Sequence, residues 1–95
     1  MPAYMISQAK VSDPDKYEEY RRATLPLLEE YGATYVLRAR DVECLEGSWD
    51  GRVIAVLEFP SLEAARRFWN CPEYLALKAL RQAAAEMDVI LVEGA

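Results

Sequence analysis

The sequence contains no histidine, and this absence removes several kinds of site at once. Histidine is the commonest metal ligand, a frequent general base near neutral pH and the usual protein ligand of haem iron. The two cysteines, Cys44 and Cys71, have no metal-binding spacing and are interpreted as reduced, partly buried thiols. We therefore expect no cofactor and no metal, and a site built from Arg, Tyr, Glu, Asp or bound water.

Basic charge and long apolar runs are also scarce. Eleven Lys and Arg residues stand against sixteen Asp and Glu, which gives a net charge of -5, whereas a nucleic-acid binder usually needs a basic face. No apolar run approaches the roughly 20 residues that span a bilayer. The first residues, "MPAYMISQAK", lack the pattern of a signal peptide. These features predict one cytoplasmic domain over residues 1–95, with no nucleic-acid partner and no membrane partner.

Apolar periodicity predicts strands and helices in the order β-α-β-β-α-β. Ser12 or Asp13 caps the first helix, which ends before Gly32. Ser61 caps the second helix, which breaks at "NCPEY" and continues to about Glu86. This order is that of a ferredoxin-like α+β fold, an antiparallel sheet with helices on one face. The expected strands cover residues 3–11, 33 to about 45, 52–59 and 87–93.

The helices have apolar positions at three- and four-residue steps. In the first helix these positions are Tyr17, Tyr20, Thr24, Leu27, Leu28 and Tyr31. In the last helical segment they include Leu75, Leu80 and Ala84.

The helix-free face of the expected sheet is also apolar. Side chains alternate along a strand, and the odd positions carry an uncharged set suited to packing under helices, including Leu37 and Ala39. Leaving the even positions in water would expose a large apolar patch, so we expect this face to pack against a second copy. The result would be a homodimer, a dimeric α+β barrel. The aliphatic members of the even set are Ile6, Val36, Ile54, Val56, Ile90 and Val92.

Three polar residues share the even set with these aliphatic ones: Gln8, Arg38 and Glu58. On a covered face, a charge must be paired or hydrogen-bonded. One interpretation is an internal Arg38–Glu58 ion pair with Gln8 as a satisfied neighbour. The other is a small polar pocket in each half of the dimer, where Arg38 holds an anionic or carbonyl-bearing ligand and Glu58 moves a proton.

Four further residues are candidates for ligand binding, each with a structural alternative. Trp49 either covers a neighbour or partner subunit or stacks on a ligand, and Arg52 either pairs with a nearby carboxylate or points into the pocket mouth. Tyr17 packs by default, as does Tyr20 on the same helix face, but the hydroxyls of both can reach a pocket rim. Trp69 is interpreted first as a core residue.

Several stretches of the chain resemble the domain-of-unknown-function family 1330 of the dimeric α+β barrel superfamily. They are "DPDKYEEY", "LEGSWDGRVIAVLEFPS" and "A…FWNCPEY". The resemblance implies a ferredoxin-like subunit and a dimeric barrel but no particular reaction. Relatives elsewhere in the superfamily include cofactor-independent monooxygenases, haem-degrading enzymes and muconolactone isomerases, which is analogy at the level of the fold. Family members often carry a second glycine where this chain has Ala33, and Arg-Gly-Gly where it has Arg38–Ala39–Arg40.

Two functions remain open on this basis. The first is a small homodimeric protein that binds or transforms a small organic molecule, such as an aromatic or carboxylate-bearing compound, without metal or organic cofactor. The second is a non-catalytic dimeric interaction or accessory module in which the Arg–Glu pair is structural.

Overall fold

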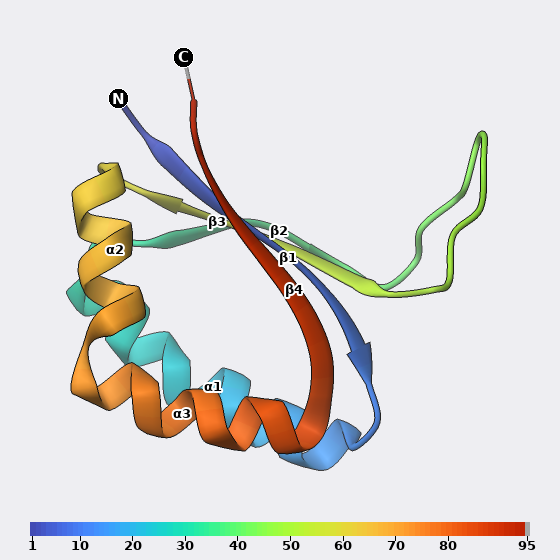
Figure 1. Ribbon diagram of the computed structural model, residues 1–95, viewed down its shortest axis with the longest axis horizontal. Helices are drawn as coiled ribbons and strands as arrows, with labels where there is room; N and C mark the ends of the chain where they lie inside the picture. Colours follow the sequence, from blue (N-terminus) through green and yellow to red (C-terminus); the bar gives the residue numbers. More distant parts are fainter. Residues whose placement is uncertain (95) are drawn as a thin grey trace.

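The computed structural model, which describes residues 1–94, has the expected order of elements with the second helix divided in two (Figure 1). The second strand ends earlier than expected and the fourth begins earlier, directly after a helix. The elements are β1 (Ala3–Val11), α1 (Pro14–Glu30), β2 (Thr34–Ala39), β3 (Val53–Phe59), α2 (Leu62–Asn70), α3 (Pro72–Ala84) and β4 (Ala85–Glu93).

The four strands form one antiparallel sheet in the order β2-β3-β1-β4. β1 lies in the middle and pairs with both β3 and β4. All three helices lie on one face of this sheet (Figure 1), so the expected α+β fold class is confirmed. No helix within the described residues is long and apolar enough to cross a membrane.

Side chains at the helix starts fix where each helix begins. Asp13 Oδ1 accepts from the backbone N–H of Lys16 at 3.2 Å, and Ser61 Oγ accepts from that of Ala64 at 3.1 Å. Cys71 separates α2 from α3 with an extended backbone conformation, and its Sγ accepts from Tyr74 N at 3.4 Å. The expected break at "NCPEY" is therefore a single-residue corner, which turns α3 back along the sheet.

An aromatic cluster joins the sheet to the helices. Phe59, Phe68 and Tyr74 are its fully buried large side chains, from β3, α2 and α3. The ring centres of Phe68 and Tyr74 are 4.6 Å apart, and those of Phe59 and Phe68 are 5.5 Å apart. Such pairs contribute about 0.5–1.5 kcal/mol beyond the area that they bury, so this cluster fixes how α2 and α3 sit on the sheet.

A β-bulge in β2 changes which of its side chains face the helices. Tyr35 lies opposite Leu57, but the next paired residue, Leu37, lies opposite Val56, so one extra residue is inserted between them. Beyond this point the alternation is reversed. Leu37 and Ala39 therefore lie on the helix-free face, and Arg38 lies on the face that the helices cover. The strict alternation expected for this strand is wrong for that reason.

Residues 40–52 form a long arm that projects from the β2–β3 end of the sheet (Figure 1). The expected continuation of the second strand to about residue 45 is wrong, because β3 begins only at Val53 and offers no partner to these residues. Gly47 and Gly51, in the second half of the arm, have positive φ values of 84° and 78°, a backbone conformation that glycine adopts without steric cost. Leu45, within the arm, is 89% exposed.

The helix-free face carries one aliphatic residue from every strand in a continuous row. Ile6 lies opposite both Val56 and Ile90, and Val56 lies opposite Leu37. We call Ile90, Ile6, Val56 and Leu37 the central aliphatic row. The bulge contributes to this row, because it brings Leu37 to the helix-free face and takes Arg38 away from it.

Candidate functional site

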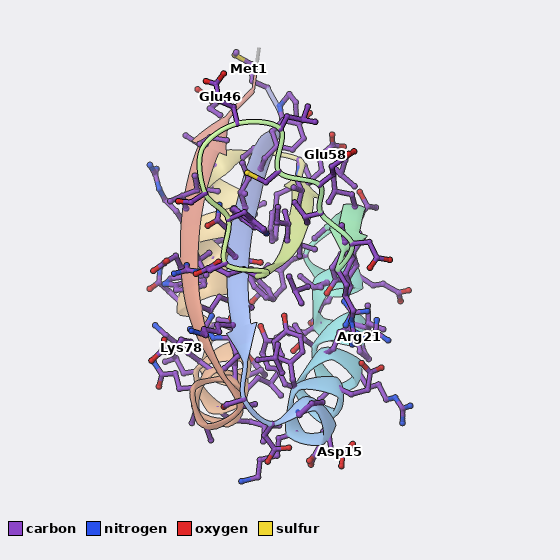
Figure 2. The ribbon with its side chains drawn as sticks, turned by 90° about the vertical axis from the view of Figure 1, so that its right-hand side faces the viewer. Met1, Asp15, Arg21, Glu46, Glu58 and Lys78 are labelled. Carbon is purple, nitrogen blue, oxygen red and sulfur yellow. The ribbon has the colours of Figure 1, made fainter. Side chains whose placement is uncertain are left out.

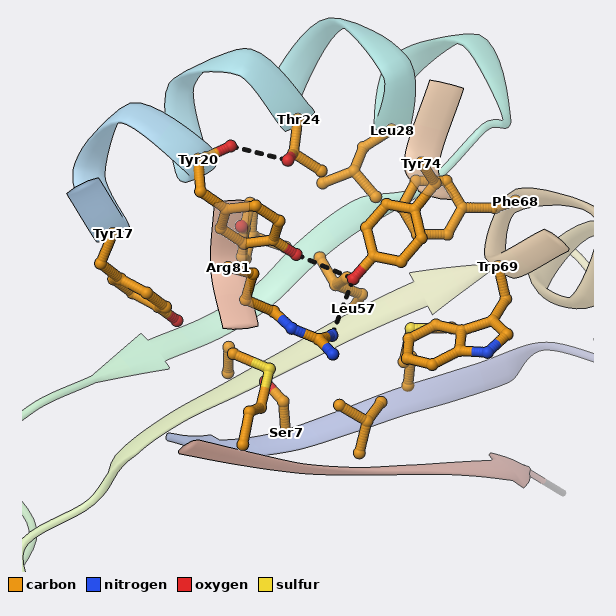
Figure 3. A pocket seen from close by; sticks show the side chains of 15 residues that line it. Ser7, Tyr17, Tyr20, Thr24, Leu28, Leu57, Phe68, Trp69, Tyr74 and Arg81 are labelled. Carbon is orange, nitrogen blue, oxygen red and sulfur yellow. Dashed lines mark hydrogen bonds between the residues drawn. The ribbon is translucent and has the colours of Figure 1, made fainter. Parts of the chain in front are cut away.

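A small cavity lies between the helices and the covered face of the sheet (Figure 3). Its volume is about 40 Å³, which is room for one water molecule. Strands contribute mainly small and aliphatic side chains to the walls, and helices contribute aromatic ones. The polar side chains that line it are Ser7, Tyr17, Tyr20, Thr24, Tyr35 and Arg81, together with the hydroxyl of Tyr74.

A chain of hydrogen bonds crosses the top of this cavity. Arg81 Nη1 donates to Tyr74 Oη at 2.9 Å, and Tyr74 Oη lies 3.0 Å from Tyr20 Oη. Figure 3 shows the two hydroxyls pointing toward one another, with the guanidinium between them and the strand that carries Ser7. Groups from α1 and α3, far apart in the sequence, thus converge above one part of the sheet.

Helix periodicity explains this convergence. Tyr17, Tyr20 and Thr24 follow one another at three- and four-residue steps on α1, and Tyr74 and Arg81 are two helical turns apart on α3. Thr24 Oγ1 donates to the backbone carbonyl of Tyr20 at 2.7 Å, so this buried hydroxyl is satisfied within its own helix. Thr24 therefore does not compete for the hydroxyls of Tyr20 and Tyr74, which bond to one another and to Arg81 beside the cavity.

Three of the tyrosines around the cavity, Tyr17, Tyr20 and Tyr35, have a raised pKa. Burial strongly raises the pKa of Tyr20, and the neighbouring Tyr74 raises that pKa further. Burial also raises the pKa of Tyr17 and of Tyr35. Desolvation penalises the charged phenolate, so these side chains remain neutral hydroxyls that can donate hydrogen bonds.

Trp69 forms a wall of the cavity and lies close to two cations. Lys78 Nζ is 4.6 Å and Arg81 Cζ is 5.5 Å from its ring centre, distances typical of cation–π contacts. Its ring centre lies 5.3 Å from that of Tyr74. The indole is therefore held by aromatic and cationic neighbours.

Five of the seven sequence-predicted residues line one of two hollows, and the other two, Arg38 and Glu58, lie elsewhere. Tyr17 and Trp69 line the cavity. Gln8, Trp49 and Arg52 border a separate open hollow of about 490 Å³ at the base of the arm. The structure thus brings together five of the candidates in two groups, and it assigns none of them a ligand.

The open hollow contains its own ion pairs. Arg52 Nε donates to Asp50 Oδ2 at 2.9 Å, and Arg52 Nη1 donates to Asp88 on β4. These carboxylates raise the pKa of Arg52, and Arg52 lowers the pKa of Asp50. The structural alternative for Arg52, pairing with a nearby carboxylate, is confirmed for Asp50. Trp49 Nε1 is buried there without a hydrogen-bond partner among the described residues.

Arg38 and Glu58 do not meet, and the expectation that they share a face is wrong. The β-bulge turns Arg38 toward α1, where its Nη2 lies 3.8 Å from Glu18 Oε2. Glu58 stays on the helix-free face opposite Tyr4, where hydrogen bonding to its carboxylate raises the pKa of the tyrosine. Figure 2 shows Glu58 toward the Met1 end of the molecule, well away from Arg21, which also binds Glu18. Neither the internal ion pair nor a joint Arg38–Glu58 pocket is formed.

The Glu18 carboxylate is expected to make stability depend on acid pH. Hydrogen bonds from Arg21 lower its pKa from 4.5 to about 2, with Arg38 and Arg22 assisting. Because the folded-state pKa lies below the unfolded value, the stabilisation is present above pH 4.5 and disappears as the pH falls toward 2. Urea unfolding of the wild type and Glu18→Gln should therefore differ most near neutral pH and converge in acid. Glu19→Gln, at an exposed position next to it, is the control and should track the wild type; a constant gap between wild type and Glu18→Gln would contradict the expectation.

The main polar groups of the cavity were not among the sequence-predicted site residues. Tyr20 is expected to pack on the buried face of α1 with a hydroxyl that can reach a pocket rim, and it does line the cavity, whereas the sequence pattern gives Arg81 no role. The signal was present in α3: an arginine two turns after a tyrosine, on the same helix face. Within residues 1–94 no three Asp, Glu or Cys side chains are positioned to hold a metal ion.

The fold and the cavity place the protein in the class of ferredoxin-like α+β proteins. Its chain belongs to the family described as Domain of unknown function (DUF1330), whose model matches residues 2–95. The resemblance of its sequence motifs to this family is thereby confirmed. No curated protein matches the chain.

Solved structures with the same fold come from several bacteria. A protein of unknown function from Rhodopseudomonas palustris has a TM-score of 0.79 and 24% identity, covering 99% of this chain and 82% of its own. A dimeric ferredoxin-like protein of unknown function from Jannaschia sp. CCS1 has a TM-score of 0.80 and 13% identity, covering 99% and 100%. SnoaB, a cofactor-independent oxygenase from Streptomyces nogalater, has a TM-score of 0.74 and 15% identity, covering 99% and 93%. At these identities the similarity shows the fold alone.

Proposed function

We propose that this protein is a homodimer that binds or transforms a small organic molecule, without metal or organic cofactor, in the cavity between its helices and its sheet. The convergence of Tyr20, Tyr74 and Arg81 on one enclosed space with apolar and aromatic walls carries the proposal. Apolar pockets with a few converging polar groups are the usual form of small-molecule sites. The description of SnoaB as a cofactor-independent oxygenase fits such a role on this fold.

The chemistry available in the cavity is hydrogen-bond donation. Arg81 carries a permanent positive charge, and the tyrosine hydroxyls are neutral donors. No Asp or Glu lines the cavity within the described residues. The site is therefore suited to hold a ligand oxygen that is anionic, or that becomes anionic during a reaction, by preorganised donors in a low-dielectric space.

The dimer uses the helix-free face of the sheet. The central aliphatic row crosses all four strands there, and Leu37 and Ile90 are 44% and 57% exposed in the single chain. No helix covers this face (Figure 1), and an apolar row of this kind favours a two-fold contact with a second copy. The dimeric description of the protein from Jannaschia sp. fits this arrangement.

The alternative function is a non-catalytic dimeric module in which the polar cluster only locks α1 to α3. The small volume of the cavity, about 40 Å³, favours this alternative, because an organic ligand needs additional room. The two functions differ in one property. A ligand raises the stability of a protein that binds it, whereas a purely structural cluster gives no change in stability when small molecules are added.

Thermal unfolding in the presence of small neutral and acidic aromatic compounds tests the proposal. At least one compound is expected to raise the unfolding temperature, because a ligand that binds only the folded state stabilises it. Ala55→Val, which adds two methyl groups to the cavity wall opposite Ser7, is expected to abolish this shift. Ala23→Val makes the same change at an exposed position of α1 and should keep it. Absence of any shift in the wild type, or a shift that survives Ala55→Val, would count against the cavity and favour the structural module.

A further inference from the structure

Within residues 1–94, Arg81 is a buried cation without an acidic partner. It is 5% exposed, and the one side-chain hydrogen bond that it forms with these residues runs from Nη1 to Tyr74 Oη. Its Nε is buried without any hydrogen-bond partner, and within residues 1–94 its guanidinium forms no ion pair with Asp or Glu. A buried charge costs free energy unless it is paired and hydrogen-bonded. Apart from the Tyr74 hydroxyl and the face of the Trp69 ring, this guanidinium has no partner among the described residues, which leaves it able to bind an anion from outside.

The free edge of the guanidinium has the shape that recognises a carboxylate. Nη1 is occupied by Tyr74, which leaves Nε–H and the adjacent Nη2–H on the other edge. These N–H groups are parallel, and arginine uses such a pair to bind both oxygens of a carboxylate. The tyrosines add another donor. Tyr74 Oη accepts from Arg81 and a single proton bridges Tyr74 and Tyr20, so one hydroxyl proton remains for a ligand.

Space for the rest of a ligand lies on the far side of the Trp69 ring. The cavity of about 40 Å³ has room for the polar head of a small organic molecule but not for the rest of it. An apolar groove of about 230 Å³ lies next to it between α2 and β4, and the two share Met5, Trp69 and Val89 as walls. A ligand whose head reaches Arg81 therefore has its body in this groove, and the indole of Trp69 must shift to join the two spaces.

The charges at the groove favour an anionic ligand. Arg66 lines the groove, and the ammonium of Lys78 lies over the ring of Trp69. No carboxylate among the described residues lines this groove. The mouth is thus locally positive in a chain whose net charge is -5, and such local fields attract oppositely charged ligands.

A second hollow also touches Arg81, where α3 passes into β4, and it is less suitable for an anion. Its walls include two carboxylates, those of Glu86 and Asp88. The other cation in its walls, Arg52, is already shared between Asp50 and Asp88.

We infer that the cavity binds a small organic carboxylate, with the carboxylate on Arg81 and the Tyr20–Tyr74 pair and the apolar body in the groove beside Trp69. The inference rests on the proposed function and names the class of molecule that this site takes. It also assigns Trp69 a role in ligand size, because its ring separates the head of the ligand from its body.

Isothermal titration calorimetry with phenylacetate and its uncharged isostere phenylacetamide tests the inference. The wild type is expected to bind phenylacetate at least about tenfold more tightly, because charge-assisted hydrogen bonds are stronger than neutral ones. Arg81→Met should remove this preference. Trp69→Ala should change the affinities for both compounds by the same factor and keep their tenfold ratio, since it alters the shared wall and leaves the carboxylate contact in place.

A matched variant and a second substitution complete the design. Arg67→Met removes the same charge from an exposed position of α2 and should keep the tenfold preference. Should Arg81→Met fail to fold, Arg81→Lys keeps the charge but lacks the parallel donors, and it should lose most of the preference. Equal binding of both compounds to the wild type, no binding of either, or a preference that survives replacement of Arg81 overturns the inference. If uncharged compounds still bind to the wild type, the proposed small-molecule function is supported even though the preference for a carboxylate is not.

Discussion

Ile90→Glu is expected to convert the proposed homodimer into a folded monomer. Ile90 lies at the β4 end of the central aliphatic row and is 57% exposed in the single chain. A two-fold interface contains each residue twice, so the substitution places two carboxylates in an apolar contact. Burying an unpaired charge costs several kcal/mol, and the interface is expected to dissociate instead. Sedimentation at micromolar concentration should give twice the chain mass of 10.8 kDa for the wild type and the single mass for the variant.

Leu75→Glu is the matched control for this experiment. Leu75 is 54% exposed on α3, so it has almost the same exposure as Ile90 but lies on the opposite side of the sheet. The control variant should remain dimeric, and both variants should keep the wild-type circular dichroism, because neither side chain belongs to the core of the subunit. A monomeric wild type, or an Ile90→Glu variant that stays dimeric, would remove the helix-free face from the proposed interface.

The fold could be predicted from the sequence because its determinants are local. Alternation defines β1 and β3, Asp13 and Ser61 occupy N-cap positions, and the corner at Cys71 is announced by the proline that follows it. Each of these features acts within a few residues, so its consequence can be worked out without knowing the tertiary structure.

The position of Arg38 could not be predicted in the same way. A β-bulge changes the alternation of β2, and nothing in "TYVLRA" identifies the inserted residue. A shift of one residue moves every later side chain to the other face. The sequence therefore pairs Arg38 with Glu58, which lies on the helix-free face. In the structure Arg38 lies on the covered face, and its partner is Glu18 from the preceding helix.

The sequence does not predict the cavity, for a different reason. The expected apolar positions of α3 included Ala84, which is buried, but also Leu75, which is exposed, and the buried face of this helix carries Tyr74 and Arg81 in addition. A charged residue is rarely buried without a partner, so an arginine is ordinarily assigned to the solvent side. Such a local conflict between residue type and burial is where a functional site is expected.

The two faces of the sheet thus have different uses. The helix-free face is apolar along its middle and suits a second copy, while the covered face encloses a polar cluster. β1 belongs to both, because Ile6 lies in the central aliphatic row and its neighbours Met5 and Ser7 line the cavity. The dimer contact would support the strands that form the floor of the cavity, so loss of the dimer and loss of ligand binding can be compared in the same Ile90→Glu variant.

Phe68→Ala is expected to lower the free energy of unfolding by about 3–5 kcal/mol, the usual cost of removing a buried phenylalanine ring. Phe68 is 1% exposed and its ring contacts those of Phe59, Tyr74 and Tyr31. A domain of this size has a total stability of about 5–15 kcal/mol, so the loss takes a large share of it. Urea unfolding at one fixed protein concentration measures the effect, because dimerisation makes stability depend on concentration.

The position of Phe68 also predicts how the variant can be rescued. Its ring lines the cavity next to Tyr74, so its removal enlarges an existing space. The added space is bordered by the rings of Phe59, Tyr31 and Tyr74. An apolar space that stays open binds small apolar molecules, and benzene should therefore raise the stability of Phe68→Ala but not that of the wild type. Leu75→Ala, at an exposed position of α3, should change stability by less than about 0.5 kcal/mol and show no response to benzene. A loss below about 1 kcal/mol for Phe68→Ala would mean that the helices move toward the sheet and fill the space. The backbone would then not hold the cavity open, and the cavity would depend on the size of the aromatic side chains.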